Sequence, residues 1–234
     1  MEKPAHLSRS AKPELMHNPF TPRFEDLPES LPIFPLPGAV VMPGIQLPLN
    51  IFEPRYLSMV FDTLGGDRMV GMLQPNPNAP HTDPEVVFTS GTAGRITSFS
   101  ETADGRLLII LTGVCRFSVL RELPPLHGYR RVLVDWSRFA GDYTSTGPNQ
   151  EAHERLLKAF HNFLKMEDLE TEWRQVVKLD SLHLVNFLSG QLPFGTEEKQ
   201  ALIESVDLDE RTRLLSALLE MYCTPAEPAP ALRH

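Results

Sequence analysis

The sequence predicts an α+β protein, a β-barrel of about six or seven short strands with one short helix, followed by a C-terminal helical bundle. Two patterns carry this prediction. Between residues 45 and 136, short stretches that alternate apolar and polar side chains are typical of half-buried strands. After residue 149, apolar side chains recur every three to four positions, which is typical of amphipathic helices. A length of 234 residues, 41% of them hydrophobic, suits one large domain or two small ones.

Proline content and periodicity divide the chain into successive segments. Residues 1–30 are proline-rich and without a sustained period, so we expect a mobile or loosely draped arm. Residues 31–140 form the predicted barrel, and residues 141–149 a linker. Residues 150–223 form the predicted helical bundle, and residues 224–234 a disordered tail.

The predicted barrel begins with a strand and a short helix. Residues 45–51 alternate in polarity, and Pro48 within them indicates an edge strand or a bulge. Pro54 suits the first position of a helix, which Gly65 and Gly66 end. The helix face that we expect to be buried comprises Tyr56, Met59, Val60 and Thr63.

Later stretches complete the barrel; the strands expected are residues 69–73, 94–100, 107–112, 117–120 and 129–136. Asp104 and Gly105 predict a hairpin with a type I′ turn, because both central residues of that turn need positive φ. The run from Leu107 to Leu111 is apolar on both faces, which predicts a buried central strand.

Four helices are expected in the bundle. The first spans residues 150–166, and Asp180 caps a second that stops at Gly190. Thr196 is expected to cap the third helix, and Asp209 to begin the last.

Composition narrows the function. With 22 basic and 30 acidic residues the net charge is −8, which argues against nucleic acid as a partner because phosphate binding needs a dense basic surface. The two cysteines and the lack of an apolar signal core indicate reduced thiols and a cytoplasmic protein. No apolar run approaches the roughly 18 residues of a membrane span.

No catalytic residue, metal ligand set or cofactor motif is predicted, so we expect no enzyme. Gly91 and Gly94 lack the lysine of a phosphate-binding loop and are expected to form a turn, and Gly113 a bulge or tight bend. His153 and Glu154 begin a zinc motif whose second histidine is missing. Cys115 has no neighbouring base in the sequence and is expected to be a buried thiol.

Residues 31–57, LPIFPLPGAVVMPGIQLPLNIFEPRYL, form the most distinctive stretch. One interpretation is a pair of strands joined by a rigid loop. The other is an apolar surface, pre-ordered by proline, that binds extended polypeptide at low entropic cost. The expected contact residues are Val41, Met42, Pro43, Ile45 and Phe52.

The same stretch resembles the amino-terminal, substrate-binding domain of Lon proteases, in the form of its stand-alone bacterial versions. The matching motifs are L-P-x-F-P-L-P-G-x-V-x-x-P-G-x-x-L-P-L-x-I-F-E-P-R-Y from Leu31, Gly91-x-x-Gly94-Arg95-Ile96, Asp104-Gly105-Arg106, Gly113-x-x-Arg116-Phe117, Leu192-Pro193-Phe194 and Glu197-Glu198-Lys199-Gln200. They cover residues 31–222. Within the first motif we expect structural roles. Glu53 would satisfy helix amides beside Pro54, and Arg55 would clamp a carboxylate or carbonyl.

The resemblance implies a PUA-like barrel and a helical bundle. In full-length Lon this region captures unfolded or tagged polypeptide for an ATPase and a Ser–Lys protease, neither of which this sequence contains. We therefore expect a non-catalytic, ATP-independent polypeptide-binding protein of protein quality control, with an apolar binding surface between barrel and helices. Three alternatives stay open: an RNA-binding PUA-like protein, a small-molecule site in the cleft between barrel and bundle, and an adaptor to a separate AAA+ protease.

Overall fold

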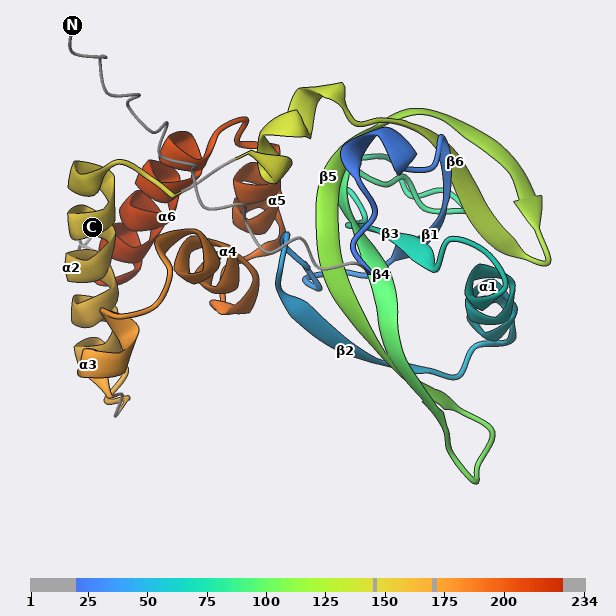
Figure 1. The fold of residues 1–234 in the computed structure, drawn as a ribbon, viewed down its shortest axis with the longest axis horizontal. Coiled ribbons are helices and arrows are strands. Elements are labelled where there is room, and N and C mark those ends of the chain that lie inside the picture. The colour runs from blue at the N-terminus through green and yellow to red at the C-terminus, as the bar shows by residue number, and fades with distance from the viewer. Residues whose placement is uncertain (1–19, 145–146, 170–171, 225–234) are drawn as a thin grey trace, which may run out of the picture.

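Six strands form one sheet that closes on itself (Figure 1). They are β1 (Ser30–Pro35), β2 (Gln46–Ile51), β3 (Met69–Leu73), β4 (Ser90–Glu101), β5 (Leu107–Leu126) and β6 (Tyr129–Asp135). Their order is β2-β5-β4-β3-β1-β6, and β5 also pairs with β6, which closes all strands except β2 into a ring. The computed structural model describes residues 20–144, 147–169 and 172–224.

Helices lie on two sides of this barrel. They are α1 (Pro54–Leu64), α2 (Gln150–Met166), α3 (Trp173–Val176), α4 (Ser181–Gln191), α5 (Thr196–Glu204) and α6 (Leu208–Tyr222). Figure 1 shows α1 beside the barrel and the other five gathered on the opposite side. Two 3-10 helices, η1 (Phe24–Asp26) and η2 (Ser137–Tyr143), flank the strands in sequence. The α+β prediction, a barrel followed by a bundle, is confirmed. No helix in the described ranges is long and apolar enough to cross a membrane.

The helix α1 forms where the sequence predicts it. Pro54 is its first residue, where a missing N–H costs no helix hydrogen bond. Gly65 lies at the carboxyl cap. The buried face matches the prediction, because its four buried residues are Tyr56, Met59, Val60 and Thr63.

The longest strand, β5, replaces two strands that the sequence predicts separately. Gly113 lies between them, and the register with β4 skips Val114 at this point, which confirms the predicted bulge. A bulge bends a strand without ending it, so one strand continues through. The prediction that residues 107–111 are buried on both faces is wrong, because Leu108 lies on the outer face and is 49% exposed.

Two predictions about glycine turns are also corrected. Gly91 and Gly94 lie inside β4 rather than in a turn. A Cβ on Gly91 would collide with the carbonyl oxygen of Met72, so glycine there permits close contact with β3. The hairpin at Asp104 and Gly105 is confirmed, but of these two residues only Gly105 has a positive φ, 81°. The turn is therefore not type I′.

The bundle contains the four predicted helices and the one-turn helix α3. α2 has the predicted bounds, and Asp180 caps α4 by accepting a hydrogen bond from the His183 N–H, 2.9 Å away. The other two caps differ from prediction. Gly195, not Thr196, precedes α5, and Asp207 caps α6 one residue before the helix begins. α4 ends at Gln191, one residue beyond the predicted glycine.

Segments that were expected to be loose are attached to the barrel. Leu27 is buried in the barrel core. The Trp136 indole donates to the carbonyl oxygen of Pro28 at 3.0 Å, and the Tyr143 hydroxyl to that of Pro22 at 2.9 Å. Residues 20–30 are therefore not a mobile arm. The remaining residues of the predicted arm, 1–19, and the tail residues 225–234 lie outside the described residues.

Candidate functional site

The proline-rich loop before β2 is buried. Val41 and Met42 have no exposed surface, and Ile45 is 3% exposed. Met42 and Ile45 form a cluster with Val40 and with Ile203 of α5. The prediction that these side chains contact a polypeptide is therefore wrong. Ile203 of α5 covers Met42 and Ile45, whereas Val41 lies in the core of the barrel. α5 lies far along the sequence from the loop, so the sequence of the loop alone does not show that this helix covers Met42 and Ile45.

Backbone contacts fix this loop as well. The Asn186 side chain of α4 donates to the carbonyl oxygen of Pro43 at 2.9 Å, so this half-buried proline is also held against the bundle. Lys199 of α5 donates to the carbonyl oxygen of Gly38 at 3.0 Å. A Cβ on Gly113 would collide with the Met42 carbonyl group, so the glycine allows β5 to approach the loop. The loop is a structural joint between barrel and bundle.

A buried charge network completes the joint. The Asp142 carboxylate accepts three hydrogen bonds from the Arg116 guanidinium, the shortest from Nη2 at 2.7 Å, and one from the backbone N–H of Arg116 at 2.9 Å. Arg116 also donates to the carbonyl oxygens of Ile203 and Ser205. Arg211 of α6 lies 3.7 Å from the same carboxylate. The apolar surface expected between barrel and helices is thus replaced by a filled interface.

The electrostatics of this network follow from its burial. Burial, and then the neighbouring Arg116, lower the pKa of Arg211 to about 9, while Asp142 opposes that shift. Arg116 lies within a motif of the family resemblance, but nothing in the sequence indicated Asp142, which falls in the predicted linker. The hydrogen-bonded carboxylate compensates charge that burial would otherwise make costly.

The two charged residues at the start of α1, Glu53 and Arg55, are at the surface. Arg55 Nη2 lies 2.9 Å from Glu53 Oε2, and the Arg55 guanidinium carbon is 4.6 Å from the centre of the Tyr56 ring. Arg55 clamps a carboxylate as predicted. Glu53 makes no side-chain bond to the helix amides, so its predicted capping role is wrong. Both residues position the start of α1.

The strand β2 offers the exposed edge that the loop does not. Among the described residues β2 pairs with β5 alone and lies outside the closed ring, and Pro48 on it confirms the predicted edge strand. Pro48 faces Ile110 in the register and has no N–H. Ladder hydrogen bonds therefore come from the alternate positions, and the backbone groups of Gln46 and Asn50 point to the free edge.

Apolar side chains accompany this edge. Leu49 and Phe99 flank Ile109 in register, so all three side chains lie on one face of β2, β5 and β4. Leu49 is half-buried and Phe99 is 50% exposed. Phe52, at the end of the strand, is 61% exposed, and the Arg106 guanidinium carbon lies 5.9 Å from its ring centre. Phe52 is the only one of the five predicted contact residues with a largely exposed side chain.

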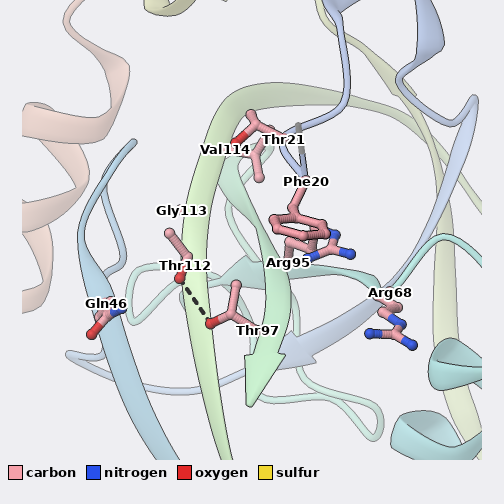
Figure 2. Close-up of a pocket in the computed structure, with 9 residues that line it drawn as sticks. All are labelled: Phe20, Thr21, Gln46, Arg68, Arg95, Thr97, Thr112, Gly113 and Val114. Atoms are coloured by element: carbon pink, nitrogen blue, oxygen red, sulfur yellow. Dashed lines mark hydrogen bonds between the residues drawn. The ribbon is translucent and has the colours of Figure 1, made fainter. Parts of the chain in front are cut away.

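A cleft lies on the outer face of the same three strands, at the Gln46 end (Figure 2). It has a volume of about 460 Å³. Gln46, Thr112 and Arg95 are consecutive cross-strand neighbours and form its floor. The Thr97 and Thr112 hydroxyls are 2.9 Å apart. The remaining lining residues are Phe20, Thr21, Arg68, Gly113 and Val114. Sequence analysis missed this site because its residues come from five separate segments.

The described residues thus form a β-barrel braced by a helical bundle, with two adjoining surface features, the outer edge of β2 and a polar cleft. A family model for the ATP-dependent protease La (LON) substrate-binding domain matches residues 30–221. The chain belongs to the family of Lon substrate-binding domains.

Relatives and solved structures agree with this assignment. Lon protease 2 of Myxococcus xanthus is 28% identical over 226 residues, which are 93% of this chain and 27% of that protein. The Lon protease of Parabacteroides distasonis is 29% identical over 216 residues, 87% of this chain and 25% of that protein. The chain thus spans about a quarter of the length of these curated relatives.

The structural neighbours carry the same domain. A Lon N-terminal domain protein from Xanthomonas campestris superposes with a TM-score of 0.60 at 26% identity, covering 80% of this chain and 97% of that one. The N-terminal domain of Mycobacterium avium complex Lon protease superposes with a TM-score of 0.62 at 16% identity, covering 82% and 98%, and shows the shared fold. The matched region is the substrate-binding domain, not the ATPase or protease parts.

Proposed function

We propose that this chain binds extended or unfolded polypeptide by adding a segment of it as a strand to the free edge of β2. The observation that carries the proposal is that edge, which lies outside the closed ring and presents the backbone of Gln46 and Asn50. Unfolded chains have unpaired backbone groups that can complete such an edge, whereas folded proteins have few. Membership of the Lon substrate-binding family supports this role.

The apolar row beside the edge would supply affinity without a strict sequence requirement. Every second side chain of an added strand projects to the face where Leu49 and Phe99 lie, and Phe52 adds exposed apolar surface beyond the end of β2. An interface of this small size is expected to bind in the roughly micromolar range. Since relatives carry this domain within Lon proteases, we further propose that clients pass to an ATP-dependent protease, for which copurification with such a protease is the test.

The test is fluorescence anisotropy with a disulfide protein that has been reduced and alkylated so that it remains unfolded. Its folded form and a structured RNA are measured beside it. Asn50→Pro removes an outward N–H and leaves the ladder with β5 intact, so it should weaken binding about fivefold to tenfold. Phe52→Ser should weaken binding by a similar factor, because it removes apolar contact area.

Leu120→Ser is the matched control. Leu120 is exposed like Phe52 but lies on the half of β5 that pairs with β6. The Leu120→Ser variant should bind the unfolded protein with the same affinity as the unmodified chain. Equal effects of Phe52→Ser and Leu120→Ser would contradict the β2 site. Binding of the RNA alone would refute polypeptide recognition altogether.

A further inference from the structure

The cleft beside β2 has the chemistry of an anion site. It presents two guanidinium groups, those of Arg68 and Arg95, together with the Thr97 and Thr112 hydroxyls and the Gln46 amide. Its lining contains no Asp or Glu among the described residues. This is unexpected in a chain whose net charge is −8. Paired guanidinium and hydroxyl donors are the groups that bind a carboxylate.

These two arginines differ from most others in the structure. Among the described residues, the arginines that make ion pairs are seven: Arg23, Arg55, Arg106, Arg116, Arg130, Arg155 and Arg211. Within the described part of the chain, neither Arg68 nor Arg95 makes one. The adjoining cavity contains Asp26 and Asp67, but Asp26 is bound by Arg23 at 2.8 Å. Asp67 makes no ion pair either, so within the described part of the chain the two guanidinium groups of the cleft have no ion-pair partner.

The fold fixes the backbone from which each of these two side chains projects. Arg95 is half-buried in β4, between β3 and β5, and the Phe20 ring lies beside it at the wall shared by two cavities (Figure 2). Arg68 has a φ of 60°, in the left-handed region that few non-glycine residues adopt. Its carbonyl oxygen accepts a hydrogen bond from the Ile96 N–H at 2.8 Å, which fixes this conformation. The two arginines therefore reach the cleft from fixed points of the backbone.

We propose that this cleft binds the C-terminal carboxylate of the polypeptide that adds to β2, an inference that rests on the proposed function. An added strand antiparallel to β2 runs toward Gln46, so its C-terminal end arrives at the cleft. Strands are about 4.8 Å apart, which places β4 about 10 Å beyond β2. The added strand lies a further 4.8 Å or so outside β2, so a tail of about four or five residues past the paired segment spans the roughly 14 Å to β4. The site would select unfolded clients that end shortly after an extended apolar segment.

The test uses one labelled peptide of about ten residues, enough for a strand of five or six residues and a tail. It is made as a free acid, as a C-terminal amide, and as an amide with Glu at its last position. We expect the free acid to bind about tenfold tighter than either amide. Arg95→Gln should abolish that difference, and Arg68→Gln should reduce it. Arg121→Gln, which removes an exposed arginine on the second half of β5, should preserve it.

Salt gives an independent readout. The advantage of the free acid should shrink between about 0.15 M and about 1 M salt, because the Debye length falls from about 8 Å to about 3 Å. Thermal unfolding of each variant establishes that it is folded.

The outcomes separate this inference from the function on which it rests. Equal binding of acid and amide overturns the carboxylate site and leaves strand addition standing. Equal binding of the acid and the Glu-ended amide overturns the C-terminal assignment in favour of an acidic side chain. If the acid and the amide bind equally and the protein binds RNA in a way that Arg95→Gln abolishes, the carboxylate site is overturned in favour of a phosphate site. Failure of all three peptides to bind overturns both proposals.

Discussion

Replacing Asp142 tests whether the buried charge network holds the barrel against the bundle. Among the described residues, Asp142 is the carboxylate that contacts both Arg116 and Arg211. The side chains of Arg116 and Asp142 are 1% and 5% exposed. Asp142→Asn keeps the shape of the side chain and removes its charge. Two buried guanidinium groups then lose their compensation, and one of them already has its pKa lowered by burial.

The expected cost is large because the remaining charges stay buried. Removing one partner of a buried ion pair costs about 3–5 kcal/mol. The free energy of unfolding of a natural domain is only about 5–15 kcal/mol, so this variant loses about a fifth of it or more. Arg211→Met in the Asp142→Asn background should recover part of the loss, because it removes a positive charge that no longer has a partner.

Urea denaturation followed by circular dichroism measures this cost as a fall in the transition midpoint at unchanged slope. The control is Glu220→Gln, which breaks the surface ion pair between Glu220 and Arg155. The Arg155 side chain is 51% exposed and the Glu220 side chain 46%. That variant should leave the midpoint unchanged within error, since surface pairs contribute little. If Asp142→Asn lowers the midpoint no more than Glu220→Gln, the argument that this network braces the two parts is refuted.

Three further perturbations follow from the structure. Gly113→Ala should lower the free energy of unfolding in urea by about 2–3 kcal/mol, because the new Cβ would collide with the Met42 carbonyl group. Gly141→Ala is the control and should be neutral, because there is open space around Gly141. Equal costs of the two variants would contradict the close approach at Gly113. Met42→Asp should lower the free energy of unfolding by about 4 kcal/mol or more, because it buries an unpaired charge. A variant with an unchanged melting temperature that fails to bind polypeptide would contradict this prediction. The hydrogen bond with the His127 ring, and then that from Tyr129, hold the pKa of Asp62 below its usual 3.8. The unfolded chain therefore binds a proton at Asp62 more readily than the folded protein does. The contribution of ionised Asp62 to stability is present above pH ~4 and is lost as the pH falls further. Asp62→Asn should flatten the resulting decline in melting temperature at low pH.

Local patterns were predictable because nearest neighbours along the chain determine them. The bounds of α2, the buried face of α1 and the edge character that Pro48 gives to β2 all follow from short-range periodicity and backbone chemistry. The α+β class and the family resemblance follow from the order of such patterns. Of the expected contact residues, Phe52 is largely exposed because the strand ends there and the chain turns into α1.

Burial was not predictable, because it depends on what folds against a segment. Nothing within residues 31–57 indicates that Ile203 covers Met42, or that Asp142 enters a core instead of a linker. The cleft likewise brings together residues that only the barrel closure places side by side, Arg95 on β4 and Gln46 on β2. The sequence by itself determined the kinds of element, their order and the family. The tertiary structure alone decided which apolar and charged side chains remain available for binding, because contacts between distant segments remove some from solvent and leave others exposed.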